Sequence, residues 1–259
     1  SNQGGDRLTG TFGNSTYLAG YMVWCIFLTA FMVLRSRMTG GLRYLYAGII
    51  ILELFTLYFT ATRGAILGVL GGAFVGGAIL ALFGKETPRL RIAALAVVVG
   101  VLVLVGGFFA LKNTSFVQES EVLSRFATIS PDQNTGKARI MVWKTAWEGV
   151  KERPVLGWGQ ENFHFVFNKF YDPEMYAQEA WFDRVHNSVF DWLIAGGVLG
   201  FLAYLSMFLV LFYYLWFRSG PFSLSERAVL TGLIVAYGFH NLFVFDNIVT
   251  YILFFSLLA

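Results

Sequence analysis

His186 is followed directly by Asn187 in the stretch HNSVFDW, at the mouth of a long apolar run. A histidine with its usual pKa of about 6.5 can take up a proton near neutral pH, which makes His186 a candidate general base. A histidine in this position can equally cap a helix or lie at a membrane interface. Asp191 lies about one turn into the same run and could orient the imidazole ring.

Two arginines are candidates for binding an anion. Arg63 lies between two apolar runs in FTATRGAILGV, where the N-terminus of the following helix would assist anion binding. Its simpler role is to anchor a helix end among lipid phosphates. Arg139 lies on an expected amphipathic helix, and its simpler role is that of a solvated charge. His240 and Asn241 repeat the His-Asn pair at another helix end, so His240 is a second candidate base.

These candidates lie in or beside one polar segment in a chain that is otherwise apolar. Residues 112–186 hold nine of the 19 Lys and Arg residues and ten of the 16 Asp and Glu residues. The whole chain is 56% hydrophobic and 14% charged, whereas soluble domains carry about 25% charged residues. Several runs contain the ~20 apolar residues that cross a bilayer. The composition therefore predicts an all-α, polytopic membrane protein and excludes a soluble enzyme.

Long apolar runs predict seven membrane helices, at 17–34, 44–62, 64–83, 92–111, 188–217, 228–239 and 248–259. We divide the chain into residues 1–111, four membrane helices after an outer N-terminal segment; 112–186, an external loop; and 187–259, the C-terminal membrane helices. The third helix contains GVLGGAFVGGA, whose small residues permit close contact with another helix. Within the loop, helical spacing predicts an amphipathic helix at 136–151 and a second, aromatic and interfacial, at 162–170.

Orientation follows from the short loops. Residues 35–43, 84–91 and 218–227 together carry eight Lys or Arg and two Glu, which places them in the cytoplasm by the positive-inside rule. The N-terminal segment, Arg63, the long loop and the patch at His240 then lie together on the outer face. We find no HExxH, no paired CxxC and no tight Asp cluster, and therefore expect no metal and no cofactor. The basic residues make no nucleic-acid footprint.

Several stretches, in order, resemble the O-antigen ligase family, which also includes O-antigen polymerases and protein O-oligosaccharyltransferases. They are GTFGNSTYLAGY, FTATRGAILGV, RIMVWKTAWEGVKERPVLGWGQENF and HNSVFDWLIAGGVLGFLAYL. Each motif is short, and their order and spacing make the resemblance specific. Family members are longer, so the chain would correspond to the C-terminal portion, with further membrane helices before it.

The resemblance implies an inverting, metal-independent glycosyltransferase of the bacterial inner membrane with a periplasmic active face. The implied donor is a glycan on undecaprenyl diphosphate, and the acceptor is a hydroxyl of a lipid A core sugar, another glycan or a protein. His186 would be the base, and Arg63 and Arg139 would bind the diphosphate. Asn187, Asp191 and His240 would have secondary roles.

Two alternatives from other classes stay open at this point. A transporter or flippase fragment would place Glu53, an acid in the middle of the second apolar run, on a transport path. A long outer segment with amphipathic helices would serve no purpose in such a protein. A non-catalytic protein that binds lipid-linked glycans would differ only in activity.

Overall fold

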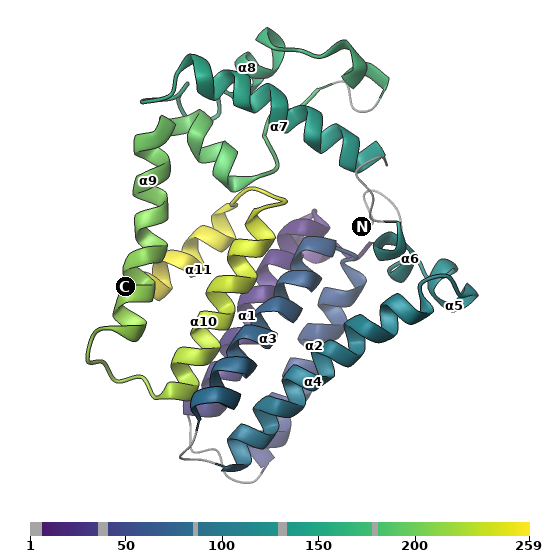
Figure 1. The fold of residues 1–259 in the computed structure, drawn as a ribbon, viewed down its shortest axis with the longest axis vertical. Helices are drawn as coiled ribbons and strands as arrows, with labels where there is room; N and C mark the ends of the chain where they lie inside the picture. Colours follow the sequence, from purple (N-terminus) through teal and green to yellow (C-terminus); the bar gives the residue numbers. More distant parts are fainter. Residues whose placement is uncertain (1–6, 36–40, 85–87, 129–133, 178–180) are drawn as a thin grey trace.

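The computed structural model describes residues 7–35, 41–84, 88–128, 134–177 and 181–259, and every regular element in these ranges is a helix (Figure 1). The predicted apolar helices are all present. They are α1 (Ser15–Arg35), α2 (Gly41–Phe59), α3 (Arg63–Phe83), α4 (Pro88–Leu111), α9 (Ser188–Trp216), α10 (Leu224–Asn241) and α11 (Ile248–Leu258). By length and composition α1, α2, α3, α4 and α9 can each cross a membrane. The all-α membrane fold predicted from composition is thus confirmed.

The bundle is organised around the close contact of α3 with α10. Gly68, Gly72 and Gly76 of α3 face backbone carbonyls of α10, and a Cβ atom on Gly72 would lie 2.2 Å from the Gly232 oxygen. Only glycine allows such an approach, as its small-residue pattern predicted. The contact fixes the first residue of α3, Arg63, beside the last turn of α10.

The polar segment folds at one end of this bundle, which we call the loop end. It contains α5 (Ser115–Gln118), α6 (Leu123–Ala127), α7 (Asn134–Glu152), α8 (Phe163–Lys169) and a 3-10 helix at Pro173–Ala177. Figure 1 shows α7 lying across the upper ends of the bundle helices. The α7 and α8 helices confirm the two predicted in the loop.

The loop end has a hydrophobic core of its own. Val142 and Val150 of α7 pack with Val166 and Phe167 of α8, and all four are buried. The apolar side of α8 is therefore covered by protein. Phe165, on its other side, is 58% exposed, and the interfacial position expected for the segment stays a prediction.

The α9 helix is broken, where the sequence predicted one over-long span. Gly197 adopts φ 62° and ψ −160°, a conformation open to glycine alone. Backbone groups released by the break bond to the loop after α7: the Trp158 amide donates to the Ile194 carbonyl (2.6 Å) and the Val198 amide to the Pro154 carbonyl (2.8 Å). These bonds join the loop end to α9 just below His186.

Candidate functional site

The His186 ring is held at the start of α9 by its neighbours. The backbone of His186 has φ 56°, a left-handed conformation that costs a non-glycine residue about 1–3 kcal/mol. Asn187 secures it: its side-chain oxygen caps α9 by accepting from the Val189 and Phe190 amides, at 2.9 and 3.2 Å. The Asn187 amide group also donates to the Leu242 carbonyl (3.0 Å). Asn187 is therefore a positioning residue that ties His186 to the turn after α10.

That turn, residues 242–247, contacts the His186 ring through Phe245. The centroid of the half-buried His186 ring lies 5.2 Å from that of Phe245 and 5.7 Å from that of Phe182. The pKa of His186 is lowered, first by burial and then by the positive charge of Arg139, while Asp183 and Asp191 oppose the shift. A lowered pKa keeps the imidazole neutral near pH 7, which is the form that can accept a proton.

Arg139 and Arg63 approach the same turn from two different helices. The Arg139 guanidinium lies 6.0 Å from the centre of the Phe243 ring. Gly64, next to Arg63, packs on the same residue, since a Cβ atom there would lie 3.5 Å from Phe243 Cβ. The pKa of Arg139 is lowered by burial and then by the charge of Arg63. Three residues far apart in sequence, Arg63, Arg139 and His186, thus surround one turn.

Two further arginines, Arg7 and Arg125, lie beside Arg63. The Arg63 guanidinium donates to the Arg125 carbonyl (3.0 Å), and Arg7 donates to the Thr62 hydroxyl (2.9 Å). We call Arg7, Arg63, Arg125 and Arg139 the arginine cluster. In the described parts of the chain, no ion pair joins the cluster to a carboxylate. Sequence reasoning missed Arg7 and Arg125, because each stands in a polar stretch with no motif around it.

Comparison with known families decides the class. A family model described as O-antigen ligase matches residues 46–205, more than half of the chain. The chain belongs to the O-antigen ligase family. This membership makes it a membrane glycosyltransferase of the ligase or polymerase type. Among curated proteins, no match is found. The matched range contains Arg63, Arg139 and His186, while Arg7 and His240 lie outside it.

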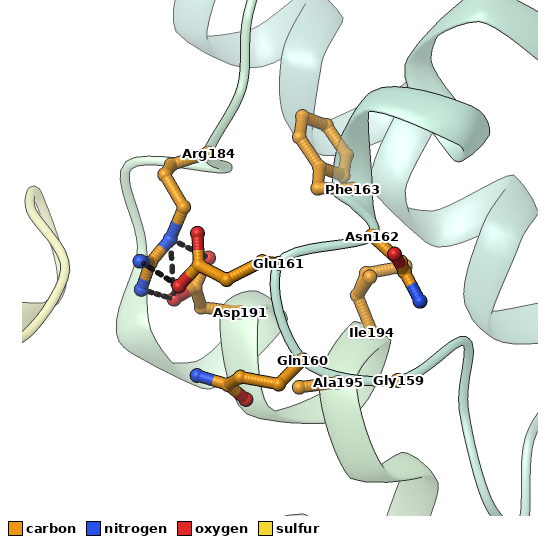
Figure 2. A pocket seen from close by; sticks show the side chains of 9 residues that line it. All are labelled: Gly159, Gln160, Glu161, Asn162, Phe163, Arg184, Asp191, Ile194 and Ala195. Carbon is orange, nitrogen blue, oxygen red and sulfur yellow. Dashed lines mark hydrogen bonds and ion pairs between the residues drawn. The ribbon is translucent and has the colours of Figure 1, made fainter.

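In this O-antigen ligase family member, Asp191 has a different partner from the one the sequence suggested. Its carboxylate pairs with Arg184, which also donates to Glu161 (2.9 Å). Figure 2 shows these three side chains at one wall of a small, open pocket that is also lined by Gln160 and Asn162. No hydrogen bond joins Asp191 to His186 within the described residues. Asp191 acts on His186 through charge alone.

His240 is a core residue of this ligase-family bundle. Its side chain is 2% exposed and lies under α1 and α3, with Nε2 3.2 Å from where a Cβ atom of Gly20 would be. A buried imidazole between three helices has no contact with the outside. His240 therefore does not face the loop end, and its position is that of a packing residue.

The segment after His240 supports the turn from below. The buried Asp246 carboxylate accepts hydrogen bonds from Tyr204 (2.8 Å), Asn241 (2.9 Å) and Tyr237. These bonds fix the end of the 242–247 turn to α9 and α10. Within the described residues, no group of three or more His, Cys, Asp or Glu side chains is arranged to hold a metal ion.

Proposed function

We propose that the protein transfers a glycan from an undecaprenyl diphosphate carrier to a hydroxyl acceptor at the loop end, which faces the periplasm. His186 takes the proton of the acceptor hydroxyl as its oxygen attacks the anomeric carbon. The bond from that carbon to the diphosphate oxygen breaks, and its electron pair leaves with undecaprenyl diphosphate. Attack opposite the leaving group inverts the anomeric centre.

In this reaction Arg63 and Arg139 bind the leaving diphosphate through charge-assisted hydrogen bonds. The observation that carries the proposal is their position: two guanidinium groups without a described carboxylate partner lie around the same turn as a histidine kept neutral by its surroundings. An anion-binding group beside a base is what departure of a diphosphate requires. The apolar helices below would hold the polyprenyl chain.

The acceptor can be a lipid A core sugar, a growing glycan or a protein hydroxyl. The full chain, purified into lipid nanodiscs, would be supplied with an undecaprenyl-diphosphate-linked glycan and each acceptor class in turn. We expect transfer to one class. His186→Ala should lower the transfer rate by ~100- to 10,000-fold, the range for loss of a general base.

His164→Ala is the matched control, because His164 lies on α8 in the same loop and its described hydrogen bond is to the Glu161 carbonyl (3.1 Å). It should transfer at nearly the wild-type rate. Near-full transfer by His186→Ala, at equal protein level, would rule out His186 as the base.

The transporter alternative depended on Glu53, and the structure gives this acid a local partner. Thr29 of α1 donates to the Glu53 carboxylate (2.9 Å), which joins α1 to α2. Together with the family match, this contact favours the glycosyltransferase. The nanodisc assay also tests the alternative of a protein that only binds lipid-linked glycans, since such a protein would transfer no glycan.

A further inference from the structure

The N-terminal segment brings Arg7 to the turn that precedes Arg63. The Leu8 amide donates to the Phe59 carbonyl (2.9 Å), and the Arg7 Nε atom donates to the Thr60 carbonyl (2.9 Å). With the bond from Arg7 Nη2 to Thr62, the segment is fixed at three points on the turn between α2 and α3. These three hydrogen bonds therefore hold the Arg7 charge near Arg63.

Arg125 reaches the same place from the polar loop. Phe126, its neighbour on α6, packs on Phe108 of α4 with ring centroids 6.2 Å apart. The Arg125 carbonyl accepts from Arg63 (3.0 Å), while its own Nε atom is buried and has no partner among the described residues. A buried guanidinium nitrogen without an acceptor is costly, so an acceptor from outside the described chain is expected.

The positive charges of the cluster also indicate a bound anion. The pKa of Arg7 is lowered, first by burial and then by the charges of Arg125 and Arg63. Like charges that are partly buried together destabilise the fold unless an anion offsets them. Among the described residues, no ion pair joins a carboxylate to the cluster, and the carboxylates of Glu161 and Asp191 pair with Arg184 instead. We infer that a bound anion balances these charges.

We propose that Arg7 and Arg125 join Arg63 and Arg139 in one anion site that selects a diphosphate over a single phosphate. The donor identity rests on the proposed function. A diphosphate that links a lipid to a glycan carries two negative charges, one on each phosphate. When the glycan leaves, the terminal phosphate gains a further charge. The positive charges of Arg7 and Arg125 would balance the part of the diphosphate's negative charge that Arg63 and Arg139 alone leave unbalanced.

Arg125→Gln is the sharpest test, because it removes the guanidinium and keeps the backbone carbonyl that Arg63 uses. Inhibition of transfer by added inorganic diphosphate would be measured for wild type, Arg125→Gln, Arg7→Lys and Arg7→Gln. We expect the inhibition constant to rise about tenfold in Arg125→Gln, the effect of one charge-assisted hydrogen bond. Arg7→Lys should lie between wild type and Arg7→Gln, since lysine keeps the charge and loses the fork.

Arg153→Gln is the matched control, since Arg153 lies at the loop end but stacks on Trp158 at 4.2 Å, outside the cluster. Its inhibition constant should equal that of wild type. Orthophosphate should inhibit more weakly than diphosphate, and phosphatidylglycerol in the nanodiscs should not remove the difference. Equal inhibition by both ions, or competition by phosphatidylglycerol, would show a site for single phosphates or lipid head groups and overturn the selectivity.

The inference and the proposed function can fail separately. Transfer with diphosphate inhibition unchanged in both Arg125→Gln and Arg7→Gln would overturn the inference and keep the function. A protein without transferase activity could still bind inorganic diphosphate in calorimetry. If that binding depended on Arg125, the proposed function would be wrong and the anion site would be supported.

Discussion

Arg184 and the arginine cluster lie at the same end of the molecule, yet their charges have opposite surroundings. The Arg184 and Asp191 side chains are only 15% and 14% exposed, and Glu161 supplies a second carboxylate. Burial works against the Arg184 charge, but Asp191 and then Glu161 raise the pKa of Arg184 overall. The cluster arginines have no carboxylate partner among the described residues, and the pKa of Arg139 is lowered.

The difference favours a structural role for Arg184 and the proposed ligand-binding role for the cluster. Arg184 joins residues 159–163 to the start of α9 and needs no ligand. The cluster leaves positive charge uncompensated at the place where His186 is neutral. His186 is close to both groups. Phe245 contacts the Arg184 guanidinium (4.4 Å) and the His186 ring, and the charge of Arg139 acts on His186.

Among the substitutions that compare these two regions, replacing Arg63 or Arg139 by lysine should have the largest effect on transfer. Lysine keeps the charge but lacks the planar fork that fits phosphate oxygens. We expect Arg63→Lys and Arg139→Lys each to lower the initial transfer rate about a hundredfold, the effect of losing one donor to a developing anion. The double variant should lose less than the sum, because both side chains act on one group.

Initial rates would be compared at matched membrane levels, with Arg153→Lys as the control outside the cluster. If Arg63 only anchors a helix and Arg139 is only solvated, lysine serves equally well. Wild-type rates in both single variants would therefore refute the binding of diphosphate by these side chains.

Arg184→Gln should reverse this pattern. The variant leaves the largely buried Asp191 carboxylate without its partner, which lowers the free energy of unfolding by roughly 1–3 kcal/mol. Thermal unfolding in detergent would measure the loss, and inhibition by inorganic diphosphate should stay close to that of wild type. Arg139→Gln, the matched variant, should weaken diphosphate inhibition with little loss of stability. Equal weakening by both variants would contradict the distinction between the two regions.

The smallest effect is a shift in the pH dependence of transfer. Arg139 and Arg184 lower the pKa of His186, and Asp183 and Asp191 raise it. Removing the Arg139 charge in Arg139→Gln favours protonation, so the pKa of His186 rises. Because the protonated ring cannot act as a base, the acidic limb of the kcat/KM profile should move to higher pH.

Arg125→Gln is the control for this profile, since Arg125 is not among the groups that shift the pKa of His186. Its rate should fall without movement of the limb. An unmoved limb in Arg139→Gln would disconnect Arg139 from the ionisation of His186.

Sequence alone determined the helices and supplied the candidate residues of the site. Apolar runs of membrane length and the period of residues 136–151 predict local structure, because burial of an apolar face depends on spacing along one segment. The family resemblance supplied His186, Arg63 and Arg139 as candidates, and the family itself is confirmed. Their proposed roles stay predictions.

Tertiary structure decided which of these groups meet. The glycine contact of α3 with α10 brings Arg63 to the turn at 242–247, and docking of α6 brings Arg125 to Arg63. In the structure Asp191 pairs with Arg184, His240 is buried in the core, and α9 is broken at Gly197. None of these outcomes follows from spacing along the chain, because each depends on which backbone and charged groups arrive from distant segments to satisfy a buried partner.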